Sequence, residues 1–67
     1  MINKVLGSKI KLLLDEKGLT QKDFAEALGI TRPATINDWI KHRTEPKIDN
    51  LIAIADYFNV SIDYLVR

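Results

Sequence analysis

The run "LTQKDFAEALGITRPATINDWI", residues 19–40, decides the fold of this chain. Thr20 has the side chain of an N-cap, and Asp23 three positions later makes a variant of the capping box. These two residues predict a short helix over 21–28. Gly29 follows at once and predicts the end of this helix.

A second helix follows after a break of only a few residues. Pro33 suits the first turn of a helix, because the N–H that proline lacks would have no partner there. We therefore expect this helix to begin at Thr31 or Arg32.

This second helix is predicted to have two unlike faces. Ile36, Trp39 and Ile40 recur at spacings of three and four and should face the core. The tryptophan is therefore interpreted as a packing residue rather than a base-stacking one. The opposite face carries small and polar side chains, namely Ala34, Asn37, Asp38 and Lys41.

Helical periodicity also extends on both sides of this region. Before it, an apolar stripe predicts a helix over 4–17 that is closed by Gly18. After it, the polar loop "KHRTEP" precedes a predicted helix over 50–58, capped by Lys47 or Asp49. The apolar stripes of these two helices are Leu6, Ile10, Leu13 and Leu14 in the first, and Leu51, Ile54, Ala55 and Phe58 in the second.

The chain should close with Asn59 as a left-handed helix end and a last short helix that begins at Ser61. Five helices and no strand are expected. We therefore predict an all-α, compact five-helix fold in which residues 1–67 form a single domain. The second and third helices make up a helix-turn-helix pattern.

Composition excludes several classes of function. There is no cysteine and only one histidine, so disulfides and thiolate metal sites are excluded, and we expect no metal or cofactor. No stretch is long and apolar enough for a membrane span or a secretory leader, which predicts a cytoplasmic protein. No nucleophile–base pair or carboxylate dyad stands in a pocket-forming context, so we do not expect an enzyme.

The net charge of the chain is only +1, but the charged residues are unevenly distributed along it. Residues 1–47 carry nine Lys and Arg against six Asp and Glu, hence +3, whereas residues 48–67 carry one against three, hence −2. The first part is the better candidate for contact with a polyanion. An excess of this size is also common on an ordinary solvated surface, so charge alone leaves both interpretations open.

The run from Leu19 to Val66 resembles the helix-turn-helix family of phage repressors and Cro proteins, which extends into many bacterial regulators. The matching elements are Gln21, Ala25, Gly29, Pro46 and the closing "NVSIDYL". The resemblance implies that the third helix lies in the major groove of DNA, with its N-terminal part toward base edges.

Donor and acceptor chemistry suggests which residues contact bases. Arg32 can pair with guanine N7 and O6, and Asn37 can pair with adenine. Ala34 and the methyl group of Thr35 can meet a thymine methyl group. Compared with the family, "RPAT" holds one extra residue at the start of the third helix, so the roles of residues 32–35 can each be displaced by one position.

Other residues are expected to contact the DNA backbone. The resemblance assigns phosphate binding to Gln21, at the free N–H groups of the second helix. Lys41 and Arg43 should bind phosphate from the end of the third helix and the following loop. Asp38 would be repelled by phosphates, so we expect it to pair with Lys41, the alternative being acceptance from cytosine N4.

Two further positions depart from the family pattern. Where the family often has a paired arginine and glutamate, this chain has Leu14 and Ile40, and we expect these two side chains to touch. His42 stands where the family usually has glycine. We expect an ordinary surface histidine there, the alternative being a left-handed conformation.

The resemblance implies a sequence-specific transcriptional regulator, most simply a phage-type repressor. It would bind double-stranded DNA as a homodimer at a palindromic operator, in a bacterial or phage-infected cell and in association with the nucleoid. No site for a small-molecule ligand is evident. The alternative function is an antitoxin or another protein-interaction module of the same fold.

Overall fold

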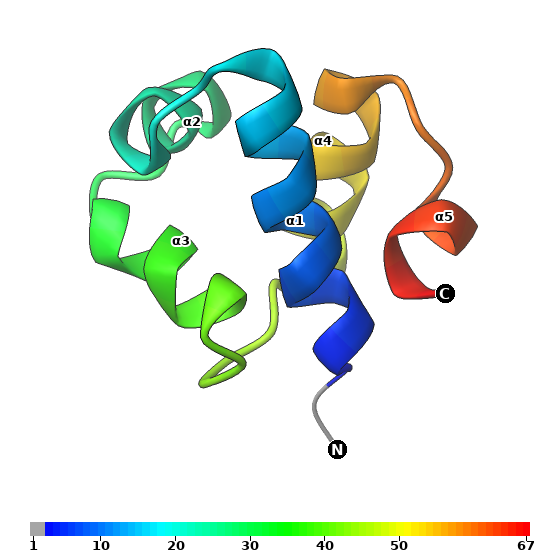
Figure 1. Cartoon of the computed structure of the whole chain (residues 1–67). Helices are drawn as coiled ribbons and strands as arrows, with labels where there is room; N and C mark the ends of the chain where they lie inside the picture. The colour runs from blue at the N-terminus through cyan, green and yellow to red at the C-terminus, as the bar shows by residue number, and fades with distance from the viewer. Residues whose placement is uncertain (1–2) are drawn as a thin grey trace.

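The computed structural model describes residues 3–67, and this part of the chain is helical without any strand (Figure 1). The all-α prediction is confirmed. The bounds of the helices are α1 Lys4–Lys17, α2 Gln21–Leu28, α3 Pro33–Ile40, α4 Ile48–Phe58 and α5 Ile62–Val66. Within residues 3–67, no helix combines the length and the apolar character that crossing a membrane requires.

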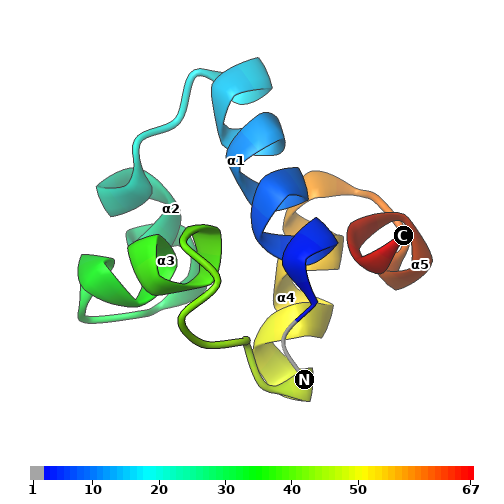
Figure 2. The same ribbon diagram turned by 60° about the horizontal axis from the view of Figure 1, so that its bottom comes forward.

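Helix α1 occupies the middle of the fold. Figures 1 and 2 show it between α3 on one side and α5 on the other, and it packs against both. Helix α2 packs against α3 and α4, and α4 packs against α5. The α2–α3 pair therefore forms one flank of the molecule, supported from behind by α1 and α4.

All five helices contribute to one core. The predicted stripe of α1 is confirmed, because its four leucine and isoleucine side chains are buried. Ile36 and Trp39 of α3 are also buried as predicted, whereas Ile40 is only half-buried at the end of the helix. Phe24 and Phe58 stack with their ring centroids 5.1 Å apart, which joins α2 to α4.

Three helices end in the same way. Gly18, Gly29 and Asn59 follow α1, α2 and α4 in the left-handed conformation, with φ of 66°, 74° and 56°. In each case the next residue donates its N–H to a carbonyl five positions back, which is the Schellman motif. That next residue is apolar and packs against the core: Leu19, Ile30 and Val60. The three predicted helix ends are confirmed.

The starts of α2 and α4 are set by their N-cap residues, Thr20 and Lys47. The Thr20 hydroxyl accepts from the N–H of Asp23 at 3.0 Å, as predicted. Helix α4 begins at Ile48, two residues before the predicted range of 50–58, and its N-cap is Lys47, one of the two predicted caps. The carbonyl of Lys47 accepts from the N–H of Leu51 at 2.9 Å. The apolar periodicity missed this first turn because the Ile48 side chain is 62% exposed and lies outside the buried stripe.

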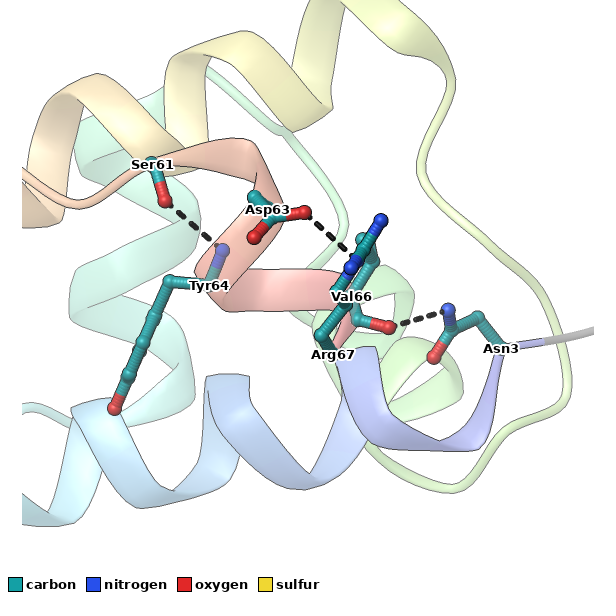
Figure 3. Close-up of polar contacts among 6 residues, drawn as sticks. All are labelled: Asn3, Ser61, Asp63, Tyr64, Val66 and Arg67. Carbon is teal, nitrogen blue, oxygen red and sulfur yellow. Dashed lines mark hydrogen bonds and ion pairs between the residues drawn. The ribbon is translucent and has the colours of Figure 1, made fainter.

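The two ends of the described chain are joined through Asn3 (Figure 3). Its side chain caps α1 by accepting from the N–H of Leu6, and it donates to the carbonyl of Val66 at 3.0 Å. Its backbone N–H donates to the carboxylate of Glu45 in the loop between α3 and α4. Asn3 thus ties α1 both to α5 and to the loop that leaves α3.

Candidate nucleic-acid interface

The turn between α2 and α3 is held by its apolar residue. Ile30 donates to the carbonyl of Ala25 at 2.8 Å and packs against the core, so the chain leaves α2 in a fixed direction. Arg32 is extended and is the N-cap of α3, with Pro33 as the first helical residue. The Arg32 side chain makes no capping hydrogen bond and is exposed, so its guanidinium is available to a ligand.

Helix α3 separates into a buried side and an open side. Ile36 is fully buried and Trp39 is 3% exposed, which fixes how the helix is rotated about its own axis. The opposite surface, here called the α3 face, consists of Ala34, Asn37, Asp38 and Lys41. Ala34 and Lys41 are exposed, and the two residues between them are half-buried. Thr35, also half-buried, stands beside this face.

The end of α3 repeats the Schellman motif with a different composition. His42 is left-handed with φ of 63°, and its N–H donates to the carbonyl of Trp39 at 3.2 Å. Arg43 then donates its N–H to the carbonyl of Asp38 at 2.8 Å. The position that is apolar at the ends of α1, α2 and α4 is therefore occupied by a cation, which lies on the surface instead of in the core.

This turn corrects the predicted partner of Asp38. Its carboxylate oxygen Oδ1 lies 3.3 Å from Nη1 of Arg43, and the pairing with Lys41 is wrong. The helix ends before Lys41, and the left-handed residue that follows reverses the chain and brings Arg43 back over the last turn. Asp38 and Arg43 are thus in direct contact on the α3 side of the molecule.

The expectation for His42 is also wrong. The residue is half-buried, and its Nδ1 is buried without a hydrogen-bond partner among residues 3–67. The left-handed alternative is the one observed, because the Schellman motif requires that conformation at this position. The ring lies against Gly7 of α1 instead of pointing into solvent.

The predicted site residues therefore fall into two groups. Gln21 is the first residue of α2, directly after its cap, and is half-buried. The remaining residues belong to α3 and the residues that flank it: Arg32, Ala34, Thr35, Asn37, Asp38, Lys41 and Arg43. Among residues 3–67 there is no cluster of His, Asp or Glu suited to a metal ion.

Sequence reasoning did not single out Gly7. Its only signal was its position inside a predicted helix, where glycine is unfavourable and so indicates a need for close packing. The structure places it at the crossing of α1 with the end of α3, where a side chain would collide with Trp39 and His42.

The sequence is similar to a known family and to several of its members. A family model described as Helix-turn-helix matches residues 10–65. The chain is 41% identical over 62 residues to Repressor protein CI of Enterobacteria phage phi80, covering 92% of this chain and 25% of that protein. It is 38% identical over 63 residues to the uncharacterized HTH-type transcriptional regulator YqaE of Bacillus subtilis strain 168, covering 94% and 53%.

A solved structure is similar over most of the chain. The crystal structure of a transcriptional regulator from Listeria innocua superposes with a TM-score of 0.85 at 34% identity, covering 91% of this chain and 56% of that one. The chain thus spans a quarter of the phage protein and about half of the other two.

Proposed function

The chain belongs to the helix-turn-helix family, and on that premise we propose that it binds double-stranded DNA as a transcriptional regulator, with α3 in the major groove. The observation that carries the proposal is the division of α3 into two sides. Its apolar side, formed by Ile36 and Trp39, is buried. On the α3 face, Ala34 and Lys41 are exposed and the two residues between them are half-buried. Small and polar side chains on an anchored helix suit direct reading of base edges.

Base recognition would come from the start and middle of α3. The exposed guanidinium of Arg32 suits guanine, and the amide of Asn37 suits adenine. Ala34 and Thr35 are small enough to let the helix approach closely and can meet thymine methyl groups. The side chains come from one short helix, so they would read a few neighbouring base pairs.

Phosphate contacts would come from the two edges of this surface. Gln21 stands at the N-terminus of α2, where free backbone N–H groups attract anions. Lys41 and Arg43 follow the C-terminal end of α3 and are exposed. In the complex we expect the Arg43 guanidinium to exchange the Asp38 carboxylate for a phosphate oxygen, since both are charge-assisted partners.

We further propose that residues 1–67 act as a single domain and that the protein works as a homodimer at a palindromic operator. Helix-turn-helix dimers read two half-sites about one helical turn apart. The similarity to a phage protein named a repressor supports repression by occupation of promoter DNA. A regulator of bacterial or phage genes would act in the bacterial cytoplasm, where the DNA lies.

Selection of bound sequences from a pool of random duplexes tests this function. We expect enrichment of a motif with two-fold symmetry. Binding should weaken with salt at a log–log slope of about −0.9 for each phosphate that is neutralised. No enrichment at low salt would contradict DNA recognition and favour a protein-interaction module, and an unsymmetric motif would contradict the dimer.

A further inference from the structure

Gly7 lies near the start of α1 and is buried. A Cβ atom added to this residue would stand 2.8 Å from Nδ1 and 2.9 Å from Cε1 of His42. The backbone carbonyl oxygen of Trp39 would be nearer still. Carbon atoms do not pack at such distances, so α1 and the end of α3 can approach this closely only because residue 7 has no side chain.

The carbonyl on the other side of this contact cannot move alone. It belongs to Trp39, whose side chain is 3% exposed and is held in the core. The same oxygen accepts the N–H of His42 at 3.2 Å in the turn that ends α3. A group placed on Gly7 would therefore displace the helix end and its turn together instead of a single flexible side chain.

The conformation of His42 is a second indication that α1 and the end of α3 approach closely at Gly7. Its backbone is left-handed, and its Nδ1 is buried without a partner within the described part of the chain. An unsatisfied buried nitrogen and a left-handed non-glycine residue are both unfavourable. The imidazole occupies space that a side chain on residue 7 would need.

We propose that Gly7 is a positioning residue for DNA recognition: it sets how closely the C-terminal end of α3 rests on α1, and so the angle at which the α3 face meets the major groove. This inference rests on the proposed function. Helix α3 has eight residues, so a shift at one end changes the direction of the whole helix. Base contacts tolerate errors of only about 0.5 Å, whereas long cationic side chains can still follow the phosphates.

The variant Gly7→Ala tests the inference through a ratio of affinities. The probes are the duplex enriched in the selection and a scrambled duplex of the same length and composition. We expect the preference for the enriched duplex to fall about tenfold, the size of losing one base contact. Affinity for the scrambled duplex should stay within about twofold, because it depends on phosphate contacts.

The ratio of the two affinities distinguishes a change in the position of α3 from partial unfolding of the protein. Partial unfolding lowers both affinities by the same factor and leaves the ratio unchanged. Ser8→Ala is the matched control, because Ser8 is the exposed neighbour on the same helix. Helix propensity favours alanine over glycine, so an open site would make Gly7→Ala more stable. We expect its melting temperature to fall instead.

A second pair of variants keeps the test valid if Gly7→Ala does not fold. His42→Gly removes the imidazole, and Gly7→Ala in that background meets only the Trp39 carbonyl. The preference should again fall from His42→Gly to the double variant. A retained preference in both comparisons overturns the inference alone, whereas a wild-type chain with no preference overturns the proposed function and the inference together.

Discussion

The carboxylate of Asp38 and the guanidinium of Arg43 form an ion pair across 3.3 Å, between the last turn of α3 and the loop that follows it. The pair depends on the left-handed His42, which turns the chain back so that the Arg43 N–H also reaches the Asp38 carbonyl. A negative charge thus sits on the surface proposed to face DNA, and it is partly neutralised before DNA arrives.

Replacing this carboxylate should strengthen DNA binding. We expect Asp38→Asn to raise affinity for duplexes of any sequence about threefold at low salt, the size of one exposed ion pair. The Arg43 side chain is 63% exposed, so stability should change by less than about 1 kcal/mol. Fluorescence anisotropy over a range of salt concentrations measures the affinity.

Asp15→Asn is the matched control, because Asp15 forms a similar exposed pair with Lys11 at 3.4 Å on α1. Its affinity should stay close to that of the wild type. If Asp38→Asn instead weakens binding only where one C·G pair is present, Asp38 accepts from cytosine N4 and the repulsion argument is wrong.

Contacts to bases and contacts to phosphates should be distinguished by a pair of variants on the α3 face. Asn37→Ala should cost about 1–3 kcal/mol at one A·T position of the enriched motif and relax the preference there. Lys41→Ala should weaken binding to all sequences and make the salt slope shallower by about 0.9. Measuring both variants on the motif and its single-base changes distinguishes these outcomes, and a uniform loss for Asn37→Ala contradicts its base contact.

A charge at position 14 should destabilise the fold. Leu14 is 3% exposed, so Leu14→Arg buries a guanidinium without a partner and should lose about 3 kcal/mol of unfolding free energy. Leu12→Arg on the same helix is the control, since Leu12 is 47% exposed and a surface change there should cost no more than about 0.5 kcal/mol. Urea denaturation measures both.

The predicted contact between Leu14 and Ile40 is tested in the same background. If the two side chains meet, adding Ile40→Glu to Leu14→Arg should recover part of the lost stability by pairing the charges. An unchanged denaturation midpoint for Leu14→Arg, or no recovery in the double variant, speaks against the contact.

Glycine at position 42 should stabilise the protein. His42→Gly removes the left-handed strain of a side chain at φ of 63°, which is worth about 1 kcal/mol. For a chain of this size that gain raises the melting temperature by about 4–8 °C. The control is Asn59→Gly, where asparagine already tolerates the left-handed conformation and the gain should be smaller. A lower melting temperature for His42→Gly would mean that packing of the imidazole on Gly7 outweighs the strain.

Local features of the sequence were enough to predict most of the fold. Thr20, Gly18, Gly29 and Asn59 mark helix ends through hydrogen bonds that span only a few residues, so their roles can be predicted without knowing the fold. The buried stripes follow from helical periodicity for the same reason. The start of α4 was predicted two residues late because Lys47 and Asp49 were both candidate caps, and the structure has Lys47 as the N-cap.

The residues of the α3 face could be predicted from the sequence, but the contacts around that face could not. Membership of the α3 face follows from helical spacing, which sequence determines. The partner of Asp38 depended on the chain reversal at His42, and that histidine took the required conformation although the residue type disfavours it. The role of Gly7 could not be predicted from the sequence, because it depends on where α1 crosses the end of α3. Such a crossing is set by the packing of side chains distant in sequence, and only the tertiary structure decides it.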